Sequence, residues 1–137
     1  MSKIPRSPRD TVRGIVYIPR MLEKIRLHAA GELPADYQEN LGGGFDGRAC
    51  AFLGVPYEEW VARVKQGGSD EEIADWAFRR GHQPNEEQIE IWNAFMEKRG
   101  WRDVAGERLV MRKGESGFAS RDDIMTFFDY IDADEGR

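Results

Sequence analysis

The segment Pro19–Ala30 carries the side chains best suited to chemistry. Arg20, Lys24 and His28 recur there at every fourth position, so in an α-helix they form one line along the axis. The apolar face of the same helix begins at Met21, which places this line at the border of the buried side. Cationic groups at such a border act in a lower effective dielectric, and a row of them suits a phosphate or a carboxylate. The spacing therefore predicts a small-anion site.

A glycine-rich segment further along the chain supplies two candidate neighbours for this site, Asp46 and Arg48. Asp46 and Arg48 would belong to the anion site if the glycine-rich segment folds over the helix at Pro19–Ala30. Residues 42–44 are three consecutive glycines, but no Gly-Lys-Ser/Thr follows them, so they are not a Walker-type phosphate loop. Backbone amides at a helix N-terminus bind anions. We expect, however, that the Asp46 side chain itself caps the short helix that follows.

Three functions fit this row of groups. The leading hypothesis is a non-enzymatic module that binds a small anionic ligand or a protein partner. The second is an enzyme in which His28 is the general acid/base while Arg20 and Lys24 clamp an anion. The third is a structural role in a homo-oligomer, most simply a homodimer.

Charge is distributed unevenly along the chain. The formal net charge is −5, yet residues 1–28 hold seven basic and two acidic side chains. Acidic residues are densest near the other end, at Asp122, Asp123, Asp129, Asp132, Asp134 and Glu135. We expect the two ends to neutralise each other within the fold or across a homodimer; the alternative is that the basic end binds an external anion. The net negative charge argues against nucleic acid as a partner, and no helix has the basic and apolar faces of a membrane-surface helix.

Metal and thiol chemistry find little support. The chain has two histidines and one cysteine, with no Cys-x-x-Cys or His-x-x-x-His spacing, so the residues predict neither a metal site nor a cofactor. Cys50 lies among apolar neighbours and is predicted to be a buried, inert thiol. A single cysteine cannot form an internal disulfide, and the N-terminal residues lack the apolar stretch of a secretory signal. We therefore expect the cytoplasm as the compartment.

Helix start and stop signals predict an all-α fold, a compact bundle of about five or six helices with an extended N-terminal arm. Capping boxes at residues 69–72 and 85–88 mark two helix starts, and Ser120 marks the start of the last helix. Residues 11–17 alternate loosely and contain β-branched side chains, so we expect them to lie extended on the helices. Residues 113–117 are rich in glycine and are predicted to be a loop.

The length and composition are those of one globular domain. The chain has 137 residues, 40% of them hydrophobic, which is enough for a single core. We predict one domain over residues 1–137, divided into an extended basic arm at 1–17, a helical bundle at 18–132 and an acidic end at 133–137.

Several longer motifs resemble those of a known family. They are Pro-Arg-Ser-Pro-Arg-Asp at 5–10, residues 19–28, Phe-Asp-Gly-Arg at 45–48 with Phe-Leu-Gly at 52–54, residues 92–103 and residues 122–129. On these motifs the chain resembles the small bacterial proteins catalogued as domain of unknown function 5069, over nearly its whole length. The resemblance implies a stand-alone bacterial protein without an attached catalytic domain. It assigns no catalytic residues.

Overall fold

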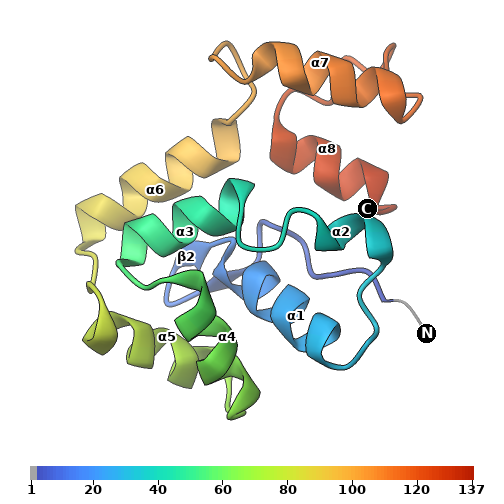
Figure 1. The fold of residues 1–137 in the computed structure, drawn as a ribbon. Helices are drawn as coiled ribbons and strands as arrows, with labels where there is room; N and C mark the ends of the chain where they lie inside the picture. The colour runs from blue at the N-terminus through green and yellow to red at the C-terminus, as the bar shows by residue number, and fades with distance from the viewer. Residues whose placement is uncertain (1–2) are drawn as a thin grey trace.

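The computed structural model describes residues 3–137, whose fold is shown in Figure 1. These residues are mostly helical, as predicted, and carry one small two-stranded sheet. Their eight helices exceed the predicted five or six. The elements are β1 (Thr11–Val12), β2 (Ile15–Val16), α1 (Ile18–Ala29), α2 (Ala35–Gln38), α3 (Gly44–Leu53), α4 (Tyr57–Lys65), α5 (Asp70–Arg80), α6 (Glu86–Lys98), α7 (Gly106–Glu115) and α8 (Phe127–Asp134).

Strands β1 and β2 form a hairpin where we expected an unpaired extended segment. They pair in antiparallel register, so the segment supplies its own partner strand. The turn residues Arg13 and Gly14 have φ of +52° and +76°, the left-handed conformation that a two-residue hairpin turn requires. Asn93 of α6 holds the hairpin by accepting from the amide of Val16 and donating to the carbonyl of Gly14.

Both predicted capping boxes are present, at the start of α5 and of α6. The hydroxyl of Ser69 accepts from the amide of Glu72, whose carboxylate accepts from the amide of Ser69. Asn85 and Gln88 make the same reciprocal pair. Each box satisfies amides that have no partner inside the first turn of a helix. These two helix starts therefore follow from the local sequence alone.

The predicted start of the last helix at Ser120 is wrong, because α8 begins at Phe127. Its cap is Thr126, whose hydroxyl accepts from the amide of Asp129 at 3.1 Å. The residues between Ser120 and Thr126 form turns. Lys113 holds these turns by donating from its ammonium to two of their backbone carbonyls. A charge-assisted bond from another helix thus replaces the helical hydrogen bonds that we expected there.

This corrected boundary can be tested by stability measurements. Thr126→Ala is expected to lower the free energy of unfolding by about 1 kcal/mol, because the cap is lost. Ser120→Ala is the matched control, and it should change stability by no more than about 0.5 kcal/mol because it removes no cap. Urea unfolding followed by tryptophan fluorescence measures both. A larger loss for Ser120→Ala than for Thr126→Ala would restore the original boundary.

The sequence pattern did not predict helix α7, and residues 113–115 of the predicted loop are its last turn, while residues 116 and 117 form the turn that follows. The helix continues to Glu115. Among its side chains only Leu109 is buried, while Val110 and Met111 are exposed. A helix that buries one side chain has no repeating apolar face, so the pattern that reveals the other helices is missing here.

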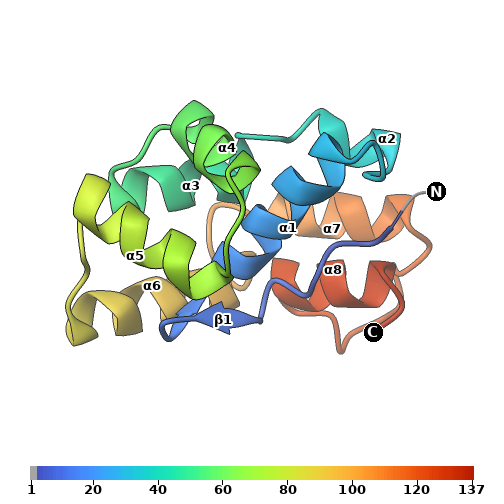
Figure 2. The same ribbon diagram turned by 90° about the horizontal axis from the view of Figure 1, so that it is seen from below.

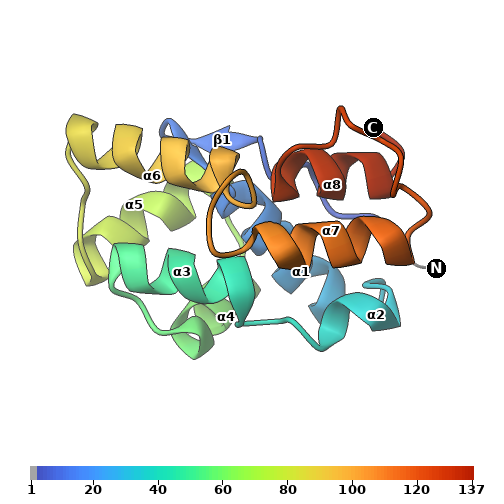
Figure 3. The ribbon, with the colours of Figure 1, turned by 90° about the horizontal axis from the view of Figure 1, so that it is seen from above.

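Helix α1 lies in the middle of the molecule. Views from below and from above agree that α5 and α6 lie at one end and α7 and α8 at the other, with α1 between them (Figures 2 and 3). Ile18, Met21 and Leu22 of α1 are fully buried, in a core that extends from Val12 to Phe128. Arg20 of α1 reaches the C-terminal end of the chain, where it pairs with Glu135 just past α8. Within residues 3–137, none of the helices combines the length and the apolar composition of a membrane-spanning segment.

Candidate functional site

A pocket of about 380 Å³ opens beside α1. Residues from α1, α2, α3, α7 and α8 line it, so it lies where the two ends of the molecule meet. Figure 3 looks onto this region, with α3 and α2 on one side and α7 and α8 on the other. A volume of this size falls within the range of pockets that hold small molecules.

Basic side chains outnumber acidic ones in the lining. The basic residues are Arg20, Lys24, Arg48, Arg99, Arg108 and Arg112, and the acidic residues are Asp36, Asp134 and Glu135. Arg20, Lys24 and Arg99 each pair with a carboxylate of the chain. By contrast, within residues 3–137 no carboxylate lies within 4.0 Å of the guanidinium groups of Arg48, Arg108 and Arg112. Asp36 and Asp134 likewise form no ion pair among these residues, so the three guanidinium groups leave a small excess of positive charge at the pocket.

Aromatic rings form much of the remaining wall. Tyr17, Phe45 and Phe127 line the pocket together, and Phe45 packs edge-on against the rings of both Tyr17 and Phe127. The guanidinium of Arg48 lies 5.0 Å from the centre of the Phe95 ring, which holds it by a cation–π contact in place of an ion pair. The pocket thus combines flat apolar surfaces with positive charge.

Lys24 belongs to a buried cluster at the pocket wall. Its ammonium lies 2.9 Å from Oδ1 of Asp46 and 3.1 Å from the hydroxyl of Tyr17. The Tyr17 hydroxyl donates to the same Oδ1 at 2.6 Å, while Oδ2 accepts from the amide of Gly42. Asp46 is completely buried, and Lys24 is 6% exposed. One carboxylate therefore satisfies an ammonium, a phenol and a backbone amide.

Burial dominates the acid–base properties of this cluster. It lowers the pKa of Lys24, and the attraction of Asp46 offsets only part of that effect. Burial also raises the pKa of Tyr17 well above its ordinary value, with the negative charge of Asp46 as a further cause. Lys24 thus gives up a proton more readily than an exposed lysine, while Tyr17 keeps its proton at neutral pH.

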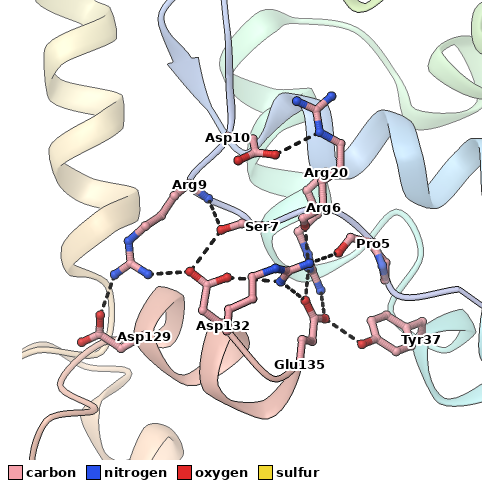
Figure 4. A network of polar contacts seen from close by, with 11 residues as sticks. Pro5, Arg6, Ser7, Arg9, Asp10, Arg20, Tyr37, Asp129, Asp132 and Glu135 are labelled. Carbon is pink, nitrogen blue, oxygen red and sulfur yellow. Dashed lines mark hydrogen bonds and ion pairs between the residues drawn. The ribbon is translucent and has the colours of Figure 1, made fainter.

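Arg20 is neutralised by the C-terminal end of the chain (Figure 4). Its guanidinium donates to both carboxylate oxygens of Glu135 at 2.8 Å, and Tyr37 donates to Glu135 at 2.6 Å. Burial alone would raise the pKa of Glu135, but these hydrogen bonds outweigh it and hold the pKa below its ordinary value. Arg137 adds a second guanidinium to the same carboxylate.

The basic and acidic ends of the chain meet within one molecule. Arg9 bonds to Asp129 and to Asp132, and Ser7 also donates to Asp132 (Figure 4). The predicted neutralisation within the fold is therefore present, without need of a second copy. It also seats residues 5–10 against α8, and so fixes one wall of the pocket relative to α1.

The structure separates the predicted site residues into three groups. Arg20, Lys24 and Arg48 line the pocket, with Arg20 and Lys24 already paired to internal carboxylates. Asp46 lies behind Lys24 and is closed off from solvent. His28 is exposed on the last turn of α1 and is not part of the lining. Of the line formed by Arg20, Lys24 and His28 on α1, only Arg20 and Lys24 therefore reach the pocket.

Asp46 does not cap the short helix as we expected. The N-cap of α3 is Gly43, and Asp46 lies in the first turn, from which its carboxylate reaches back to the amide of Gly42. Gly42 has φ of +77°, and a Cβ there would lie 2.9 Å from the ring of Tyr57. Only glycine meets both demands, which explains this part of the run 42–44.

Sequence reasoning missed several lining residues, among them Arg99, Arg108 and Arg112. The spacing of Arg108 and Arg112, four residues apart, was available as a signal, since such residues share a helix face. This spacing did not point to a site, because the sequence pattern did not predict α7 as a helix. Arg99 lies just past α6, where no local pattern points to it.

Within residues 3–137, neither the Cys50 thiol nor the residue types that bind metals provide a second candidate site. Cys50 is half-buried, and burial raises its pKa to about 11, which keeps the thiol protonated at neutral pH. Among residues 3–137 no cluster of three or more histidine, cysteine, aspartate or glutamate side chains has the arrangement of a metal site.

The described residues thus define a mostly helical protein with a basic, aromatic-lined pocket. The chain belongs to the DUF5069 family, described as "Domain of unknown function (DUF5069)", whose family model matches residues 2–137. This match confirms the resemblance drawn from the motifs. A search of curated proteins finds no match to the chain.

Proposed function

We propose that this protein binds a small organic anion in the pocket beside α1. The observation that carries the proposal is that three guanidinium groups, those of Arg48, Arg108 and Arg112, line the pocket and have no carboxylate within 4.0 Å among the described residues 3–137. Arginine binds phosphate and carboxylate through paired hydrogen bonds, which gives both attraction and orientation. Arg108 and Arg112 lie one turn apart on α7, so they present their charges to one side of the pocket.

Arg20 and Lys24 have a different role in this proposal. Glu135 and Asp46 already neutralise them, so they contribute little net attraction for an external anion. They instead hold the wall of the pocket in place. Replacing them would leave buried carboxylates unpaired and would disturb the fold, which makes them poor residues for a binding test.

The rest of the lining specifies the ligand further. Tyr17, Phe45 and Phe127 offer aromatic surface, which suits a molecule with a flat or apolar part. Gly43 and Gly44 bring the N-terminus of α3 to the pocket, and its partial positive charge adds to that of the arginines. The best-fitting class is therefore a small molecule with an apolar part and one or more phosphate or carboxylate groups.

Calorimetric titration tests the proposal directly. The probes are inorganic pyrophosphate, citrate and adenosine monophosphate, with uncharged adenosine as the comparison. At least one anion should bind better than adenosine. Arg108→Gln/Arg112→Gln is expected to weaken that binding about tenfold or more, because two charge-assisted contacts are lost.

The matched control is Lys65→Gln/Arg79→Gln, which removes the same charge from exposed positions outside the pocket. It should leave the affinity within about twofold at moderate salt. Equal weakening by both double variants would show diffuse surface attraction in place of a pocket. Failure of all three anions to bind the parent protein would also overturn the proposal.

A further inference from the structure

We propose that Lys24 forms an imine with a small aldehyde that carries a phosphate or carboxylate group. The inference rests on the proposed function, since the arginines of the pocket would hold the anionic group of the aldehyde. It adds a covalent reaction at the pocket wall and names the ligand class as anionic carbonyl compounds.

The position of Lys24 is the first argument. A lysine that serves only as half of a buried ion pair can be enclosed completely, yet Lys24 is part of the lining of a solvent-connected pocket. Buried ion pairs also contribute little net stability compared with well-packed apolar residues, so stability alone gives no strong reason for this pair. The three unpaired arginines line the same pocket as the amine.

The neighbours of the amine supply the second argument. Imine formation needs a neutral amine, a proton acceptor and a proton donor. Asp46 lies 2.9 Å from the Lys24 nitrogen and can take a proton from it. Tyr17 lies 3.1 Å from the same nitrogen and carries a hydroxyl proton. Burial, which lowers the pKa of Lys24, makes the neutral amine easier to reach than in an exposed lysine.

The reaction balances without any further reactant. The ammonium of Lys24 passes one proton to Asp46, and the nitrogen lone pair then bonds to the carbonyl carbon. The carbonyl oxygen takes one proton from Tyr17, which regains a proton from Asp46 across their hydrogen bond. A second proton moves from the carbinolamine nitrogen to this oxygen, which leaves as water as the C–O bond breaks and the C=N bond forms. One hydrogen of the original ammonium stays on the iminium nitrogen and two leave in the water. Tyr17 and Asp46 end in their starting protonation states, and Asp46 remains the counter-ion of the iminium.

Reductive trapping provides the test, with pyridoxal 5′-phosphate as the probe aldehyde. The full-length protein is incubated with the probe, reduced with borohydride, digested and mapped by mass spectrometry. The chain has five lysines, and two of the exposed ones, Lys65 and Lys98, act as internal references. The adduct on Lys24 should exceed that on either reference by about tenfold at limiting probe, because the pocket raises the local concentration of the aldehyde.

Two controls connect the label with the pocket. Pyridoxal, which lacks the phosphate, should give little preference for Lys24, and pyrophosphate in excess should protect Lys24 from the phosphorylated probe. Lys24→Arg keeps a cation beside Asp46 but cannot form an imine, so it should lose this adduct. If that variant does not fold, the peptide map of the parent protein still decides.

The outcomes separate this inference from the proposed function. If the probe competes with pyrophosphate for the pocket but leaves Lys24 unlabelled, the imine is excluded while anion binding stands. If the label falls on Lys65 and Lys98 and pyrophosphate protects nothing, the imine and the binding function both fail.

Discussion

Replacement of Asp46 by alanine is expected to lower the free energy of unfolding by about 3 to 5 kcal/mol. The carboxylate is completely buried and serves Lys24, Tyr17 and the amide of Gly42 at once. Its loss leaves a buried ammonium without a counter-ion and two donors without an acceptor. The Lys24 ammonium, the Tyr17 hydroxyl and the Gly42 amide then carry the full free-energy cost of desolvation. Urea unfolding at neutral pH measures the effect, and a loss below about 1 kcal/mol would contradict it.

A double variant separates the cost of an unpaired charge from the cost of a missing side chain. Lys24→Met/Asp46→Asn removes both charges and keeps an oxygen that can accept from Tyr17. It should be more stable than Asp46→Ala by about 1 kcal/mol or more, because no charge is left buried alone. If the double variant is the less stable of the two, the ion pair itself is strongly stabilising and our account of the cluster is wrong.

Glu135→Gln is expected to cost about 3 kcal/mol at neutral pH. The substitution keeps the shape of the side chain but removes the negative charge that Arg20 faces across two 2.8 Å hydrogen bonds. The side chains of Arg20 and Glu135 are 6% and 3% exposed, so water cannot replace the lost interaction. Glu115→Gln, at an exposed glutamate outside the pocket, is the matched control and should change stability by no more than about 0.5 kcal/mol.

The stability difference between the parent protein and Glu135→Gln is expected to depend on pH. Because the pKa of Glu135 is lowered in the fold, its contribution to stability is complete above the ordinary glutamate value of about 4.3. The contribution decreases as the pH falls through the lowered pKa. The difference in melting temperature between the parent protein and Glu135→Gln should therefore be constant from about pH 5.5 to neutrality, about one pH unit or more above that value, and shrink in stronger acid. A difference that grows in acid would contradict the assignment.

The parts of the fold that the sequence predicted depend on short-range interactions. The capping boxes at Ser69 and Asn85 join residues three apart, so their pattern is complete within a few letters. The line of Arg20 and Lys24 at the border of the core follows from helical periodicity in the same way. The wrong prediction of a helix start concerns a segment held by interactions between residues farther apart in the chain. Ser120 has the letters of a helix start, but Lys113 from the preceding helix binds the turns there.

The sequence predicted three of the six basic residues that line the pocket and missed Arg99, Arg108 and Arg112. Arg20, Lys24 and Arg48 were recognised by residue type and spacing, and they line the pocket. The charge gradient predicted that the basic and acidic ends meet, but it did not identify Glu135, 115 residues further along the chain, as the partner of Arg20. The sequence also did not show that His28 lies outside the pocket, because this depends on where the pocket ends along α1.

The amino-acid sequence by itself determined that this chain is mostly helical, where several of its helices begin, and that cations lie beside the core on α1. The tertiary structure alone decided that α1, α3, α7 and α8 meet around a pocket, and which of its cations remain unpaired. The physical reason is the range of the interactions. Helical hydrogen bonds and caps join near neighbours, whereas an ion pair or a cavity wall joins residues whose separation in the chain carries no information about their distance in space.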